Sequence, residues 1–270
     1  MVAIILDGKK LAEKIKLNIY GEIKSLAKKP RIAVILVGKD YASRLYVKKK
    51  QEDCKKVGIL SNRYDLNEDI KEEEIIKLIK NLNKDQGING ILIQLPLPKS
   101  INKKQVLSQI NPKKDVDGLM SKIFQTCTPK GIIRLLSEYD IEVKGKNIVI
   151  INNSDIVGIP LANLLSEKYA TVTICNEYTA NLIEHTKKAD ILVSGVGIPN
   201  FIKEDMVKDM AVIIDVGISK INDKVCGDVD FDKVKNKTAY ITPVPGGVGP
   251  ITVAMLLENT LEAYKLQNSK

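Results

Sequence analysis

The segment KNIVIINNSDIVGIPLANLL, residues 146–165, decides the fold. Its first part is a short, continuously apolar run, which is typical of a strand buried on both faces of a parallel sheet. Its second part has the apolar spacing of an amphipathic helix. A strand, a polar turn and a helix in this order predict one unit of an α/β fold. In such a unit a ligand phosphate rests on the helix N-terminus.

The same alternation of apolar runs and helical stretches continues along the chain. The candidate strands lie at residues 3–6, 32–38, 90–97, 146–152, 170–176, 189–195, 210–217 and 239–244. The main candidate helices lie at residues 41–57, 70–84, 128–139, 157–168 and 251–265. This pattern predicts an α/β fold with parallel sheets.

The strands fall into two sets, which predicts two α/β domains with a cleft between them. Residues 1–125, joined by the C-terminal helix 248–270, would form a catalytic domain. Residues 126–247 would form a Rossmann-like, nucleotide-binding domain.

Composition excludes several classes of protein. The net charge is +9, but aromatic residues are only 4% and lysines are spread along the chain, so no nucleic-acid partner is expected. The chain has no run of 18 apolar residues, so no membrane span is expected. His185 is the single histidine and the four cysteines form no C-x-x-C pair, so no metal site is expected. These features predict a cytoplasmic protein.

The predicted helix 41–57 carries the first candidate for chemistry. At about 100° per residue, Lys50 falls within the apolar arc, whereas Lys48, Lys49, Lys55 and Lys56 fall opposite. A lysine placed there suits proton transfer. The alternative is a lysine whose stem packs while its amine reaches water.

Two polar residues interrupt or follow apolar runs. Gln94 lies in GILIQLPLP, where a buried amide needs partners, and ligands are common partners at the carboxyl end of a parallel strand. Asp117 lies in DVDGL, where it either belongs to an ordinary turn or accepts two N–H bonds from a heterocycle. The alternative for Gln94 is a cap on a neighbouring backbone group.

Two loops could hold flat or anionic ligands. Residues 151–165 are only a weak phosphate-loop match, but Glu177 follows the next strand, where a carboxylate can hold a ribose 2′-OH. Residues 245–250, PGGVGP, form a rigid loop with few side chains that lets backbone approach a flat ligand. The alternative for this loop is an interdomain turn.

Together these stretches resemble the bifunctional methylenetetrahydrofolate dehydrogenase/cyclohydrolase family. Eight segments match in order along nearly the whole chain. They are S-x-x-Y-x-x-x-K (43–50), QLPLP (94–98), KDVDG (114–118), CTPKG (127–131), S-x-IVG-x-P (154–160), the VIDVGI-like IIDVGI (213–218), GDVDF (227–231) and TPVPGGVGP (242–250). The last is long and highly specific.

The resemblance implies an enzyme that oxidises 5,10-methylenetetrahydrofolate with NAD or NADP and hydrolyses the methenyl product to 10-formyltetrahydrofolate. Lys50 would be the catalytic lysine, tuned by Gln94. Tyr46 would stack on the folate and Asp117 would anchor the pterin. The substrate site would also include Ser43, Ile93, Leu95, Pro245, Gly246, Gly247, Val248 and Gly249. The cofactor site would include Asn152, Asn153, Ser154, Ile156, Glu177, Gly197 and Ile218. A homodimer is implied as well.

The chain departs from the family where many members bind the 2′-phosphate of NADP. Asn153 replaces the family's arginine, and Glu177 replaces its serine. A carboxylate repels a phosphate but suits a free ribose diol, so use of NAD is expected at least as well as NADP. A dehydrogenase without cyclohydrolase activity, and a non-catalytic folate- or nucleotide-binding dimer, remain as alternatives.

Overall fold

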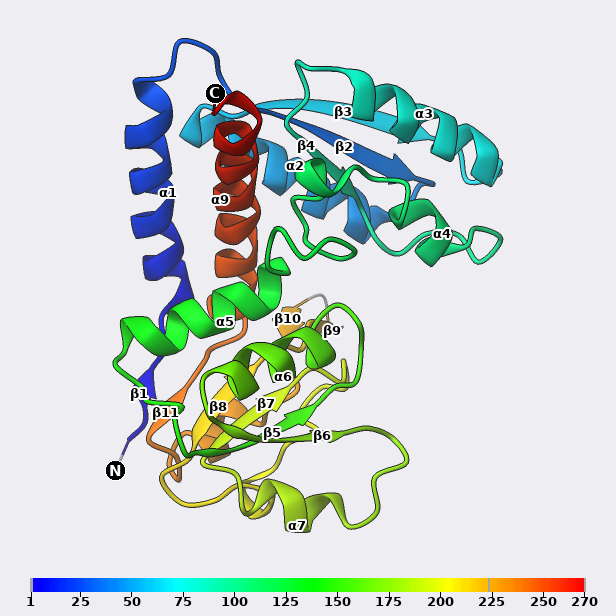
Figure 1. The fold of residues 1–270 in the computed structure, drawn as a ribbon. Helices are drawn as coiled ribbons and strands as arrows, with labels where there is room; N and C mark the ends of the chain where they lie inside the picture. The colour runs from blue at the N-terminus through cyan, green and yellow to red at the C-terminus, as the bar shows by residue number, and fades with distance from the viewer. Residues whose placement is uncertain (1, 223, 270) are drawn as a thin grey trace. The chain divides into compact units, whose positions relative to one another are not determined.

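A computed structural model describes residues 2–222 and 224–269 of the chain, which forms two compact units. Unit 1 comprises Thr128–Thr252 and the N-terminal residues up to Glu13. Unit 2 comprises Lys14–Cys127 and the C-terminal residues from Val253. The chain passes from one unit to the other within α1 (Gly8–Lys24), at the start of α5 (Cys127–Glu138) and within α9 (Val248–Asn268) (Figure 1).

Unit 1 is built on a six-stranded, all-parallel sheet with the strand order β1-β11-β8-β7-β5-β6. The strands are β1 (Ile4–Ile5), β5 (Asn147–Ile151), β6 (Thr171–Cys175), β7 (Ile191–Ser194), β8 (Val212–Asp215) and β11 (Tyr240–Ile241). The strand order runs from β5 outward to β6 on one side and to β7 on the other. This change of direction is a topological switch point, where open α/β sheets bind ligands.

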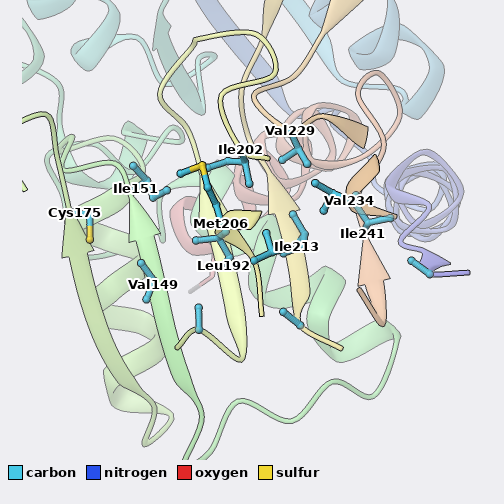
Figure 2. Packing of buried hydrophobic residues seen from close by; sticks show 14 residues of the cluster. Val149, Ile151, Cys175, Leu192, Ile202, Met206, Ile213, Val229, Val234 and Ile241 are labelled. Carbon is cyan, nitrogen blue, oxygen red and sulfur yellow. The ribbon is translucent and has the colours of Figure 1, made fainter. Parts of the chain in front are cut away.

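The core of unit 1 explains why its strands are continuously apolar. Val149, Leu192, Ile213 and Ile241 are register neighbours on adjacent strands and belong to one buried cluster. Figure 2 shows these side chains together with Met206 and Val234. The alternate strand residues, such as Ile148 and Ile150, are buried as well. Both faces of the central strands β5, β7 and β8 are therefore covered, whereas the edge strands β1 and β6 are more exposed.

Short elements complete unit 1. Helix α6 contacts β5 and β6, and Figure 1 shows it over one face of the sheet. The elements are α6 (Gly158–Glu167), α7 (Leu182–Thr186), α8 (Phe231–Val234), the 3-10 turn η2 (Glu204–Met206), and the antiparallel hairpin of β9 (Ser219–Ile221) and β10 (Lys224–Cys226).

Unit 2 contains a three-stranded parallel sheet with the order β3-β2-β4. Its strands are β2 (Arg31–Val37), β3 (Leu60–Leu66) and β4 (Gly90–Ile93). Its other elements are α2 (Tyr41–Val57), α3 (Glu72–Lys84), α4 (Lys103–Leu107) and the 3-10 turn η1 (Pro112–Lys114), with most of α1 and α9. Apolar residues of β2, β4, α3 and α4 form one buried cluster.

The predicted α/β fold with parallel sheets is confirmed, with differences in detail. Strand β3 was not predicted, because it is an edge strand whose sequence, LSNRYDL, is largely polar and only partly buried. Strand β1 pairs with β11 of unit 1, so the N-terminal residues do not stay with residues 14–125 as predicted. Parallel pairing over such a separation leaves no local signal. In the described part of the chain, no helix is long and apolar enough to span a bilayer.

Candidate functional site

Helix α2 places Lys50 on its inward side. The Asp40 carboxylate caps the helix by accepting a 2.7 Å bond from the Ser43 backbone N–H, which also lowers the pKa of Asp40. At the other end Gly58 adopts φ 83, as a left-handed C-cap needs. Lys50 is half-buried, whereas the other lysines of α2 are exposed, as the helical spacing predicts. These exposed lysines are Lys48, Lys49, Lys55 and Lys56.

Gln94 lies immediately beyond the carboxyl end of β4 and contacts Lys50. The Lys50 amine donates a 3.0 Å hydrogen bond to Gln94 Oε1, and the Gln94 amide nitrogen donates at 2.7 Å to the Leu95 carbonyl. The second bond turns the amide oxygen toward the lysine. The interruption of the apolar run at Gln94 therefore reflects a specific polar contact, and the Leu95–Pro96 bond that follows is cis.

Asp117 lies within electrostatic reach of the same lysine. Burial of its carboxyl raises the pKa of Asp117, the nearby charge of Lys50 lowers it, and Asp115 raises it. A hydrogen bond with the Cys127 side chain lowers the pKa further. An amine, an amide and a carboxyl from distant parts of the sequence thus converge within unit 2.

The loop that carries Asp117 is held by residues that sequence reasoning missed. Asp115 is buried and accepts backbone N–H bonds from Met120 and Ser121 at 2.9 and 2.8 Å. Asn259 of α9 is fully buried and donates to the carbonyls of Val116 and Gln125 at 2.9 and 3.0 Å. The available signal was an asparagine in the apolar stretch AMLLENTL.

The other predicted substrate-site residues of unit 2 differ in exposure. Tyr46, one turn before Lys50, is 37% exposed, and partial burial raises the pKa of its hydroxyl. Leu95 is half-buried, whereas Ser43 is buried and Ile93 is packed in the apolar core. The side chains with free surface beside Lys50 are therefore Tyr46 and Leu95.

In unit 1 the Asn152 side chain organises the turn between β5 and α6. Its Oδ1 accepts bonds from the backbone N–H of Ser154 at 3.0 Å, the Ser154 hydroxyl at 2.6 Å and the Gly158 N–H at 3.1 Å. Its amide nitrogen donates to the Gly195 carbonyl after β7. Asn152 therefore joins the two strand ends at the switch point. Its side chain is committed to the loop itself.

This edge of the sheet fits a dinucleotide. A Cβ on Gly158 would lie 1.7 Å from the Asn152 carbonyl oxygen, so only glycine allows α6 to start this close to β5. Asn153 is exposed and Ile156 half-buried at the helix N-terminus. Glu177 is exposed just beyond the carboxyl end of β6.

The remaining predicted residues lie on loops of unit 1. Gly197 is exposed with φ 74, and Ile218 is 50% exposed. In the loop 245–249, Pro245 is exposed and follows a cis bond, whereas Gly247 and Val248 are buried. A Cβ on Gly8 would lie 1.9 Å from the Gly247 carbonyl oxygen, so α1 begins directly against this loop.

Fold and site together define a class. A parallel sheet with a glycine-dependent turn at its switch point is typical of dinucleotide-dependent enzymes. The second unit adds a lysine, an amide and a carboxyl suited to proton transfer.

Comparison with known proteins identifies the family. The tetrahydrofolate dehydrogenase/cyclohydrolase catalytic domain matches residues 6–117, and the NAD(P)-binding domain of the same family matches residues 126–268. The bifunctional protein FolD of a Nitratiruptor species is 52% identical over 97% of this chain and 98% of its own.

Solved structures agree with this match. The bifunctional FolD enzyme of Campylobacter jejuni is 44% identical and superposes with a TM-score of 0.95, covering 98% of this chain and 99% of its own. The Trypanosoma brucei enzyme, solved with NADP and an inhibitor, is 32% identical with a TM-score of 0.93, covering 98% of both chains. This chain belongs to the tetrahydrofolate dehydrogenase/cyclohydrolase family. The predicted family, fold class and pair of enzyme activities are confirmed.

Proposed function

We propose that this chain oxidises 5,10-methylenetetrahydrofolate and hydrolyses the methenyl product with the residues predicted from its sequence. The observation that carries the assignment of residues is the 3.0 Å bond from Lys50 to Gln94 with Asp117 in electrostatic reach. Family membership accounts for the two activities, and this cluster accounts for where the second one occurs.

Hydrolysis needs a group that moves a proton. Water adds to the cationic methenyl carbon, its proton leaves, and the bond from that carbon to one ring nitrogen breaks as the nitrogen is protonated. The Lys50 amine takes one proton from the attacking water and returns it to the nitrogen, and the second proton of that water leaves to solvent as the carbonyl forms, so the reaction releases one proton overall. Gln94 holds the amine in place through its oxygen.

The pterin ring requires directional hydrogen bonds and a flat contact. Asp117 would accept two parallel N–H bonds from the pterin, which suits a carboxyl that is held near a lysine. Tyr46 would stack on the ring, Leu95 would line its edge, and Ser43 would support the turn of α2 from within. The loop 245–249 would present backbone to the folate. The buried Ile93 and Val248 side chains would support the site without touching the ligand.

The cofactor would be held by unit 1. Asn152 and Ser154 would shape the phosphate loop, with Asn153 and Ile156 at its surface, and Gly197 and Ile218 would face the nicotinamide. Bound NAD(P)+ supplies the acceptor for the hydride. The exposed Glu177 carboxylate suits the ribose diol of NAD and repels the 2′-phosphate of NADP. We therefore infer that NAD is used at least as well as NADP.

The test is an absorbance assay of methylenetetrahydrofolate oxidation with NAD and NADP in parallel. We expect reduced cofactor to form with both, and kcat/KM with NAD to equal or exceed that with NADP. A strong NADP preference would refute the cofactor inference. Decay of supplied methenyltetrahydrofolate tests hydrolysis separately, and its absence would leave a dehydrogenase alone.

We infer two further properties of this chain. We infer a homodimer, which light scattering on a sizing column would reveal as twice the chain mass. We also infer a cytoplasmic location. In the described residues all four cysteines are free thiols, which suits a reducing compartment, and fractionation of cells would test this location.

A further inference from the structure

Asp228, in the segment GDVDF, is a buried carboxylate that accepts hydrogen bonds from one loop. Its two oxygens take the Ser194 hydroxyl at 2.9 Å and three successive backbone N–H groups. Those are Val196 at 2.7 Å, Gly197 at 2.9 Å and Ile198 at 3.1 Å. All four donors are neutral, and three consecutive amides around one anion form a nest of the kind that usually holds a ligand. Here the protein's own carboxylate fills it.

Asp215, in the segment IDVGI, extends this arrangement to a second loop. Its carboxylate accepts the Gly217 N–H at 2.9 Å, the Asp228 N–H at 3.0 Å and the Val229 N–H at 2.9 Å. Its own N–H donates to the Thr242 hydroxyl at 2.7 Å. The two aspartates therefore tie the loop after β7, the loop after β8 and the chain at residues 228–229 into one network.

Glycines make this network possible. A Cβ on Gly217 would lie 2.1 Å from Asp228 Oδ1, and a Cβ on Gly227 would lie 2.0 Å from Asp215 Oδ2. The Asp228 carboxylate thus passes over Gly217, two residues after Asp215, and the Asp215 carboxylate passes over Gly227, the residue before Asp228. This interlocking explains two matched segments, IDVGI and GDVDF, to which hydride transfer and hydrolysis assign no chemistry.

The network lies at the cofactor edge of the sheet. Ser194 and Asp215 end neighbouring strands in register, and Ser194 faces Ile151 at the end of β5 on its other side. A 3.0 Å bond from the Ser219 hydroxyl to the Gly197 carbonyl joins the two loops at the surface. The inward amides are taken by Asp228, so the loops present outward the half-exposed apolar side chains Ile198 (52%) and Ile218 (50%).

We propose that Asp228 and Asp215 are positioning residues that set the surface on which the nicotinamide end of the cofactor rests. This inference builds on the proposed function. Neither carboxylate touches the cofactor: they fix residues 196–198 and 216–218, and the exposed apolar atoms of those residues bind the flat ring. Loss of the network would therefore weaken cofactor binding and hydride transfer, while hydrolysis at the Lys50 cluster would continue.

The test compares Asp228→Asn with Asp230→Asn. The amide substitution places an NH2 group against backbone N–H donors, so we expect the KM for the nicotinamide cofactor to rise about tenfold or more. Hydrolysis of methenyltetrahydrofolate should stay within about twofold of the unaltered chain. Asp230 belongs to the same segment, but its carboxylate pairs with the surface lysines Lys203 and Lys233 at 3.5 Å, so its variant should change neither activity.

A milder variant guards against misfolding. Ser194→Ala removes one of the four donors and should raise the cofactor KM about threefold with hydrolysis unchanged. An unchanged cofactor KM in a folded Asp228→Asn or Ser194→Ala chain would overturn the proposal, as would a parallel fall of both activities. If the unaltered chain showed no dehydrogenase activity, the proposed function would fail, and calorimetric titration with NAD+ would still test the two variants.

Discussion

The two units each contain a buried aspartate cluster, and the clusters differ in how fully their carboxylates are paired. In unit 1, Asp228 accepts four hydrogen bonds, three of them from backbone N–H groups. In unit 2, no backbone N–H among the described residues donates to Asp117. The charge of Lys50 and a hydrogen bond with the Cys127 side chain lower the pKa of this carboxyl, against the effect of its burial. A carboxylate with all its acceptor sites filled fixes geometry, whereas one with sites left open can bind a ligand.

The largest expected effect tests the cluster of Lys50, Gln94 and Asp117 in unit 2, whose Asp117 carboxylate has acceptor sites left open. Lys50→Met should lower the rate of methenyltetrahydrofolate hydrolysis about 10²–10⁴-fold, because it removes the proton-transfer group. The KM should change much less than kcat, since Asp117 and Tyr46 remain. Lys49→Met, on the exposed side of the same helix, is the matched control and should keep the original rate. Undiminished hydrolysis in Lys50→Met would remove this lysine from the mechanism.

A smaller effect tests whether the cluster of Asp215 and Asp228 in unit 1 is tightly packed. In Gly217→Ala the new Cβ would meet Asp228 Oδ1 at 2.1 Å and Asp228 N at 2.8 Å. We expect a loss of about 1–3 kcal/mol in the free energy of unfolding. Gly21→Ala, in α1, meets nothing within 4 Å and should gain up to about 1 kcal/mol. Urea unfolding of both variants measures the difference, and equal stability would contradict the tight packing.

The smallest effect concerns pH. Burial raises the pKa of Asp215 to about 6, so its proton binds more tightly in the folded chain than in the unfolded chain. Its contribution to stability is therefore fully present below about pH 4 and is lost as the pH rises through about 6. Asp215→Asn should remove about 1 kcal/mol of pH dependence between about pH 5 and 7. Urea unfolding at both pH values measures this.

The pKa of Asp190 is shifted in the opposite direction to that of Asp215. Bonds from Lys208 and from the Asn147 N–H lower the pKa of Asp190, so its stabilisation is present at neutral pH and is lost as the pH falls. Asp190→Asn should reduce the loss of stability in acid. Above about pH 5 it should leave the pH dependence of the free energy of unfolding unchanged. The same change of pH dependence in both aspartate variants would contradict the assignment of the Asp215 shift.

Much of the fold could be predicted from local pattern. Helix α2 was predicted at 41–57 and observed there. The buried strands β2, β5, β7 and β8 and the partly buried edge strand β6 lie within about one to two residues of their predicted ranges. The edge strand β3 was missed because its alternation is weak and its side chains are only partly buried. The pairing of β1 with β11 could not be read, since it joins residues more than two hundred positions apart.

The sequence by itself determined the family, the parallel α/β class and the inward direction of Lys50. It could do so because periodicity, glycine placement and long specific segments are local properties. Only the tertiary structure decided which groups meet: Lys50 with Gln94, Asn259 with the loop that carries Asp117, and Asp228 with the loop after β7. Such contacts depend on hydrogen-bond geometry between distant segments, which no spacing along the chain encodes.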